Sequence, residues 1–409
     1  MRDVYSKADL CIAATGAQSG DIGLFFGRDI ELLTPVRIEA TWLKNHDLLH
    51  WPSLGSYLFG FHNVRVWKAI DNAPLNRRAW VAQERFLSKR TLHFTQSLLF
   101  WECPTSFTSE NDAMARTSLH SRLTSLKTRL NCVQWPDLDV DAMQDITLDS
   151  TNNDTKLREV YLTWCQFLYH YTSCGITRES DILVALVGVA DEVGHAMSDC
   201  MVAGLWKTRF IEELCWRSHG DTSRPIVWRA PSWSWASLSN PVLPSACTSS
   251  HIPHEMAAVI ELCISKKSSG EVEQGSALIE CRPISATVQY SGAEGSNGAY
   301  NALGTLDESV WAFSEKSNPE RSGLIEVQLD DTDALCYHDD QVLDVQLLAL
   351  LEFSFGPGSR IKLEGICVVD SEHQAGASER VGSFYTFDEA AELVLAAYGR
   401  ARVQAILLI

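Results

Sequence analysis

Apolar residues near the start of the chain predict a short helix that runs directly into a strand. Residues 1–8 have the pattern of a helix end, and residues 10–14 form an apolar run that a Gly-rich turn follows. A strand that is apolar on both faces needs a neighbouring strand on each side, as in the sheet of an α/β protein. No strand is predicted before residues 10–14, so we expect the amino-terminal half of this module to be missing.

The next clear pattern is a helix followed by a hairpin. Pro74 sets the start of a helix, because a proline in the first turn costs no hydrogen bond, and residues 80–87 continue it with mixed faces. Residues 90–95 and 98–101 then alternate between apolar and polar side chains on either side of a two-residue turn. This alternation predicts two antiparallel strands.

The rest of the chain is first polar, then helical, then rich in strands. Helices are predicted over residues 154–171, 179–196 and 202–216. Strands are predicted over residues 259–265, 277–281, 284–290, 324–329, 346–353, 361–369, 382–387 and 403–409. We therefore predict an α+β chain with four parts: an α/β module at 1–110, a polar linker at 111–154, a helical region at 155–220 and a β-rich region at 221–409.

Composition and charge exclude several classes of protein. The 409 residues include 34 Lys and Arg against 52 Asp and Glu, and the resulting net charge of −18 disfavours nucleic-acid binding. The longest apolar run, 182–190, is too short to span a membrane, and the first residues lack the pattern of a secretory signal. The 12 Cys are scattered without a CxxC pair, as in a reduced protein. We expect a cytoplasmic protein.

No strong catalytic or nucleotide-binding motif is present, so no cofactor is predicted. Cys247, His251 and His254 could ligate a metal, but a fourth ligand is missing and the segment is a Ser/Pro-rich loop, so we predict no metal site. A run of acidic residues is similar to a calcium loop without its Gly and terminal Glu, and we expect a hydrated loop. Its members are Asp330, Asp331, Asp333, Asp339, Asp340 and Asp344.

Two groups of side chains are candidates for function. The first combines Arg with polar and aromatic residues, namely Arg77, Arg78, Trp80, Gln83, Glu84, Arg85, Arg90 and Trp101. Arginine recognises carboxylates and phosphates, so this group is either a buried ion-pair network or a surface for a ligand or partner. The second is the alternating pair Trp233 and Trp235, which share one face if the chain is extended there. They are either core residues or a binding platform.

These blocks resemble fungal heterokaryon incompatibility (HET) domain proteins over nearly the whole chain. The front of the chain has the family's M..VY..A.L.I.A and GLF..R stretches, and RAPSWSWAS at 229–237 resembles its trailing region. The hallmark R.W..QE....R..HF....WEC is matched by Arg78, Trp80, Gln83, Glu84, Arg90, His93, Phe94, Trp101, Glu102 and Cys103. A weaker similarity to the family follows at Glu364, Gly365, Val368, 380–382 and Phe384.

The resemblance implies a fold and a function. HET domains are similar to TIR domains, which have a flavodoxin-like parallel sheet with a ligand crevice at the strand ends. The family's strands with LSY.WG and W.D..CI.Q are missing here, so no catalytic residue is carried over, and Glu84 is the first carboxylate to test. The implied function is non-self recognition through protein partners or self-association, as a signalling or scaffold module that promotes growth arrest or cell death. The alternatives are a TIR-like enzyme that cleaves NAD and a degenerate, inactive copy.

Overall fold

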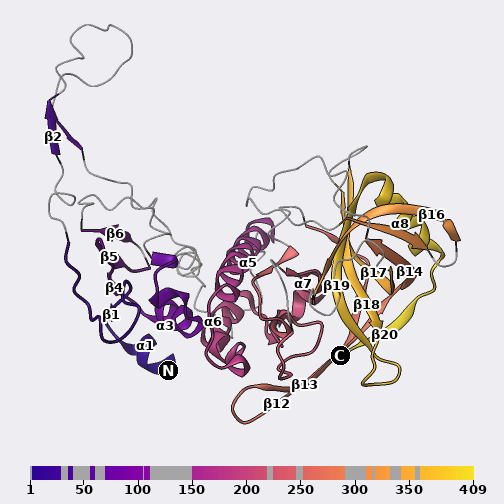
Figure 1. Ribbon diagram of the computed structural model, residues 1–409, viewed down its shortest axis with the longest axis horizontal. Coiled ribbons are helices and arrows are strands. Elements are labelled where there is room, and N and C mark those ends of the chain that lie inside the picture. Colours follow the sequence, from indigo (N-terminus) through magenta and orange to yellow (C-terminus); the bar gives the residue numbers. More distant parts are fainter. Residues whose placement is uncertain are drawn as a thin grey trace, which may run out of the picture. The chain divides into compact units, whose positions relative to one another are not determined.

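The chain folds into two compact units, Met1–Gln144 and Asp145–Ile409 (Figure 1). The computed structural model describes residues 2–28, 36–39, 56–59, 70–104, 106–110, 150–218, 224–245, 252–290, 310–315, 318–331, 342–354 and 360–409. Residues 111–149 of the predicted linker lie outside the described residues, and residues 150–154 are described. The protein is α+β, with a β-rich carboxyl-terminal region. Among the helices of the described residues, none has the length and apolar character needed to cross a membrane.

The first unit is built around a small mixed sheet with strand order β1-β4-β5-β6. Its elements are α1 (Arg2–Lys7), β1 (Cys11–Ala13), η3 (Leu75–Arg77), α3 (Ala79–Leu87), β4 (Thr91–Phe94), β5 (Leu99–Glu102) and β6 (Phe107–Ser109). Strand β1 is parallel to β4, and the other pairs are antiparallel. A separate hairpin joins β2 (Val36–Glu39) to β3 (Ser56–Phe59). The predicted first helix, strand 10–14, helix 80–87 and hairpin are confirmed.

The second unit begins with helices and short turns around a core of tryptophans. Its elements are α5 (Ser150–Thr172), η5 (Glu179–Asp181), η6 (Val184–Leu186), α6 (Val187–Met197), β7 (Met201–Val202), β8 (Leu205–Trp206), η7 (Lys207–Arg209), α7 (Phe210–Leu214), β9 (Arg217–Ser218), η8 (Trp235–Ser237) and β10 (Val242–Leu243). The fully buried Trp164 packs edge-on against Trp206, with ring centroids 5.2 Å apart.

Two of the three helices predicted in this region are partly wrong. Residues 179–186 form two 3-10 turns, and the α-helix begins only at Val187. The predicted helix at 202–216 is a short hairpin followed by one helical turn. Ala203 and Gly204 both have positive φ, 46° and 95°, which an α-helix does not allow. The apolar spacing was right for a buried segment, but this two-residue turn reverses the chain.

Six long antiparallel strands of the second unit close into a ring, in the order β14-β15-β16-β19-β18-β17 and back to β14. The elements are β11 (His254–Glu255), β12 (Ala258–Lys266), β13 (Val272–Cys281), β14 (Ile284–Tyr290), β15 (Val310–Glu315), β16 (Asn318–Leu329), β17 (Val342–Ser354), β18 (Ile361–Asp370), β19 (Ser378–Phe387), α8 (Asp388–Arg400) and β20 (Gln404–Leu408). Closure leaves the ring strands without free edges. All eight predicted strands are found, whereas β15 and α8 were missed.

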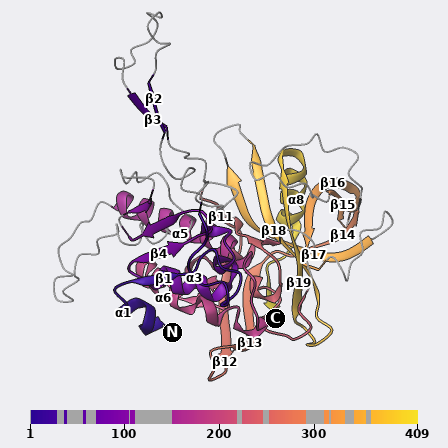
Figure 2. The ribbon, with the colours of Figure 1, turned by 60° about the vertical axis from the view of Figure 1, so that its left-hand side comes forward.

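Helix α8 supplies the ring with part of its core (Figure 2). Its buried Ala391, Val394 and Ala397 join one cluster with side chains of β14, β16, β17, β18 and β19. After α8 the chain enters β20, which pairs antiparallel with β13, and β13 pairs in turn with β12. The three strands β12, β13 and β20 thus extend the sheet away from the ring.

Candidate functional site

The buried centre of the first unit is an ion-pair network on α3. Arg85 is 4% exposed, and its Nε donates to Oε2 of Glu102 at 2.7 Å while Nη1 donates to Oδ1 of Asp71 at 2.9 Å. Glu102 lies on β5 and Asp71 precedes the helix. Because a guanidinium in a fixed fork joins the two carboxylates, it fastens α3 to the sheet and to the segment before it.

The network continues across the sheet to the loop after β1. His93 of β4 places Nε2 at 2.8 Å from Oε2 of Glu102 and Nδ1 at 2.9 Å from the Thr15 hydroxyl. Glu102, His93 and Thr15 are all fully buried. We call Thr15, Asp71, Arg85, His93 and Glu102 the Arg85 network. Since water does not reach it, each polar group depends on its partners inside the protein.

The electrostatics of the Arg85 network favour the charged guanidinium. Burial acts to lower the pKa of Arg85, but the carboxylates of Glu102 and Asp71 outweigh it, and the pKa lies above its usual value. A buried charge that loses its partner is strongly destabilising, whereas the complete pair is nearly neutral against an apolar core. The network therefore favours one arrangement of helix and sheet over others.

Other side chains of the predicted site lie outside the network. Arg78 and Arg90 are exposed, and Trp80 and Trp101 are half-buried. Gln83 is buried on α3. The structure thus divides the predicted group into an enclosed part and an accessible part.

Glu84 is half-buried and lies next to Arg85 in the sequence, but its hydrogen-bond partner is a tyrosine. The Tyr5 hydroxyl on α1 donates to the Glu84 carboxylate. Burial first, and then this hydrogen bond and the nearby negative charge, raise the pKa of Tyr5 to about 12. Glu84 is thus a half-buried carboxylate with a neutral hydrogen-bond donor.

The two tryptophans of the second predicted group are core residues of the second unit. Trp233 and Trp235 are buried, and the chain between them is a turn that leads into η8. Trp235 Nε1 donates to the Gly204 carbonyl at 2.7 Å, and Trp233 packs edge-on against Phe210 with centroids 5.2 Å apart. Their burial rules out a binding platform.

The predicted loops have different outcomes. Cys247 and His251 lie outside the described residues, and His254 is exposed on β11. In the part of the chain that the structure describes, no three His, Cys, Asp or Glu side chains converge as metal ligands. Asp330 was expected in a hydrated loop, which is wrong, because its carboxylate is buried 3.1 Å from Nε of Arg380.

Some residues of these networks were missed by sequence analysis. Asp71 and Thr15 were not singled out, and no local pattern marks them. Arg380 was noticed only as part of a faint motif, and its strand, SERVGSFYTF, carries too many polar residues to mark it as buried.

Comparison with known proteins identifies the front of the chain. Residues 1–84 match the family model described as heterokaryon incompatibility protein (HET). The match ends at Glu84, so it includes Arg78 and Trp80 but not Arg85 or Glu102. A search of curated proteins and a search of solved structures returned no match. The segment that contains α1, β1 and most of α3 is therefore similar to the HET family model.

Proposed function

We propose that this chain acts in heterokaryon incompatibility as a cytoplasmic signalling or scaffold module that promotes growth arrest or cell death through protein contacts. The observation that carries the proposal is the division of the hallmark residues. Arg85 and Glu102 are enclosed, whereas Arg78 and Arg90, which flank α3 in the sequence, are exposed. Arginine and tryptophan on a rigid surface are the side chains that most often dominate protein interfaces.

The test is inducible expression of the full chain in a fungal host. We expect growth arrest with the unaltered chain and a loss of arrest with the double variant Arg78→Ala/Arg90→Ala. Arg402→Ala, which removes an exposed cation from the second unit, is the matched control and is expected to arrest growth like the unaltered chain. Equal arrest by the double variant, at equal protein level, would contradict the contact surface.

A second candidate function rests on Glu84. An enzyme that cleaves NAD would need a carboxylate beside the ribose, and Glu84 is a half-buried carboxylate with one neutral donor, Tyr5. The parallel pair of β1 and β4, connected through α3, supports a TIR-like and flavodoxin-like relationship of this sheet. Release of nicotinamide from NAD by the purified chain, abolished in Glu84→Gln, would favour this enzyme over the scaffold.

A further inference from the structure

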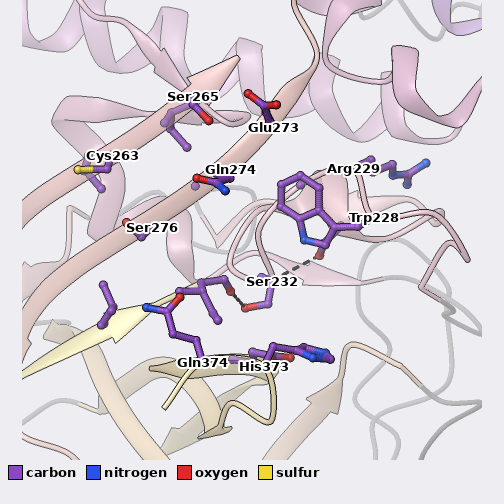
Figure 3. Close-up of a pocket in the computed structure, with 18 of the residues that line it drawn as sticks. Trp228, Arg229, Ser232, Cys263, Ser265, Glu273, Gln274, Ser276, His373 and Gln374 are labelled. Carbon is purple, nitrogen blue, oxygen red and sulfur yellow. Dashed lines mark hydrogen bonds between the residues drawn. The ribbon is translucent and has the colours of Figure 1, made fainter. Parts of the chain in front are cut away.

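The second unit contains an open groove on the three-stranded extension of its sheet. Its volume is about 980 Å³, and its lining comes from β12, β13, β20 and the loops at 224–237 and 373–379. Apolar side chains on the sheet include Leu262 and Ile264 of β12 and Leu407 of β20. Figure 3 shows the strands β12 and β13 on one side of the hollow and His373 and Gln374 on the other. The groove lies in Asp145–Ile409, outside the segment that matches the HET family.

One wall of the groove is an exposed tryptophan. Trp228 is 53% exposed and lines the groove, and the two residues before it, Ile226 and Val227, are also exposed. Figure 3 places the Trp228 indole between the β13 side and the turn with His373. A large aromatic ring in this position offers a flat apolar face, which also attracts cations. Three successive exposed apolar residues on one loop are typical of a contact surface.

Two arginines and two glutamates line the groove, and of these four side chains only Glu273 is exposed. Arg229 is occupied, since its Nε donates to the Ala236 carbonyl at 2.6 Å and Nη2 to the Leu238 carbonyl. Arg224 donates to the Arg380 carbonyl at 2.7 Å. Glu379 accepts a hydrogen bond from the Ser371 hydroxyl at 2.5 Å, so the accessible carboxylate of the groove is that of Glu273 on β13. A ligand with a basic side chain is therefore complementary to the groove.

The groove adjoins a strand edge. Strand β12 is the last in its sheet, and within the described ranges its only strand partner is β13. An edge strand presents backbone donors and acceptors to an added strand. In a strand added to β12, every second side chain points to the same face as Leu262 and Ile264, which is the face of the groove.

From this arrangement we propose that β12 and the groove bind an extended peptide by strand addition. The peptide carries an apolar side chain over Leu262 and Ile264 and, two residues away on the same face, a Lys or Arg that lies against Trp228 and Glu273. Backbone hydrogen bonds to β12 supply affinity, and the groove selects the side chains. This site is separate from the exposed Arg78 and Arg90 of the first unit. Its test is independent of the test of the proposed function.

The test is selection from a random displayed peptide library on the full chain. Enriched peptides are expected to alternate apolar and Lys or Arg positions, and a fluorescein-labelled consensus peptide then gives the dissociation constant by anisotropy. Glu273→Lys and Trp228→Ala are each expected to weaken binding by about tenfold or more. Glu280→Lys on the same strand and Val403→Ala at another exposed apolar position of the second unit do not line the groove and serve as matched controls.

Backbone N-methylation of the peptide distinguishes strand addition from other modes of peptide binding. N-methylation of single backbone amides of the consensus peptide should weaken binding at alternate positions only, since every second amide faces β12. No enrichment over bare support, enrichment of acidic peptides, or binding unchanged in Glu273→Lys would overturn the proposal. Concentration-dependent dimerisation of the chain without peptide binding would assign the edge to a second copy and would equally overturn it.

Discussion

The guanidinium of Arg380 lies flat on the indole of Trp216, with Cζ 3.3 Å from the ring centroid, and its Nη2 donates to the Trp216 carbonyl at 2.7 Å. Nη1 donates to the Leu214 carbonyl at 2.9 Å, and Asp330 completes the set as an ion pair. Arg380 belongs to β19 of the ring, whereas Leu214 ends α7 and Trp216 lies two residues after it. One fully buried side chain thus joins the helical part of the second unit to its ring.

Arg380→Met is expected to destabilise the second unit by about 3–5 kcal/mol, because it removes the nearer ion-pair partner of the buried Asp330, which keeps Arg224 at 3.9 Å, and takes the donor from two buried carbonyls. Urea unfolding followed by tryptophan fluorescence measures the loss. Adding Asp330→Asn to Arg380→Met should recover part of it, since the poorly compensated charge is then removed. A loss below about 1 kcal/mol, the scale of a surface ion pair, would show that the pair is not structural.

Stability of the second unit should fall with rising pH because of Glu213. Burial, opposed by the hydrogen bond from the Trp206 amide, raises the pKa of Glu213 well above 4.5. The folded protein therefore holds a proton that the unfolded chain releases above pH 4.5, and stability decreases as the pH rises from there through the folded pKa. Urea midpoints measured between pH 4.5 and 9 should decline, and Glu213→Gln should flatten the decline. A profile unchanged in Glu213→Gln would refute the assignment.

Glu102→Gln is expected to loosen α3 from the sheet of the first unit. The substitution keeps the shape of the side chain but removes one charge from the Arg85 network, and a broken buried pair costs about 3–5 kcal/mol. Hydrogen exchange of the α3 amides should accelerate accordingly. Glu110→Gln, at a part-exposed pair with Arg28, should change exchange by less than about 1 kcal/mol. Equal effects of the two variants would argue against the network.

Two glycines should respond to alanine in opposite directions. Gly204 has φ +95°, and a Cβ there would lie 2.8 Å from Nε1 of Trp235, so Gly204→Ala should cost more than about 1 kcal/mol. Gly399 lies in α8 with nothing within 4 Å of an added Cβ, and Gly399→Ala should stabilise by up to about 1 kcal/mol. Thermal unfolding of both variants measures the two shifts. Stabilisation by Gly204→Ala would mean that the turn is not required.

The elements that sequence analysis predicted well are those whose signals are local. The helix at 79–87 and the hairpin of β4 and β5 follow from spacing within a few residues. Helix α8 was missed although Ala391, Val394 and Ala397 have helical spacing. The turn at Gly204 was missed because a positive φ leaves little trace in an apolar segment.

The partners of buried charges could not be predicted for a different reason. The hydrogen bond from Arg380 to Leu214 joins residues 166 positions apart, and Thr15 reaches His93 over 78 positions. Such pairs depend on how whole strands are placed, and no pattern in the sequence near either residue specifies the other. Sequence analysis named Arg85 in the first candidate group and Glu102 in the HET hallmark, but only the fold shows that they bind each other.

The place of β20 between β13 and β19 has a consequence for synthesis of the protein. Strand β13 leaves the ribosome long before residues 404–408, and until these arrive one of its edges has no neighbour. During translation of everything from β14 to α8, the nascent chain therefore displays an open edge to other polypeptides. Molecular chaperones would be needed most in this interval, before β20 pairs with β13.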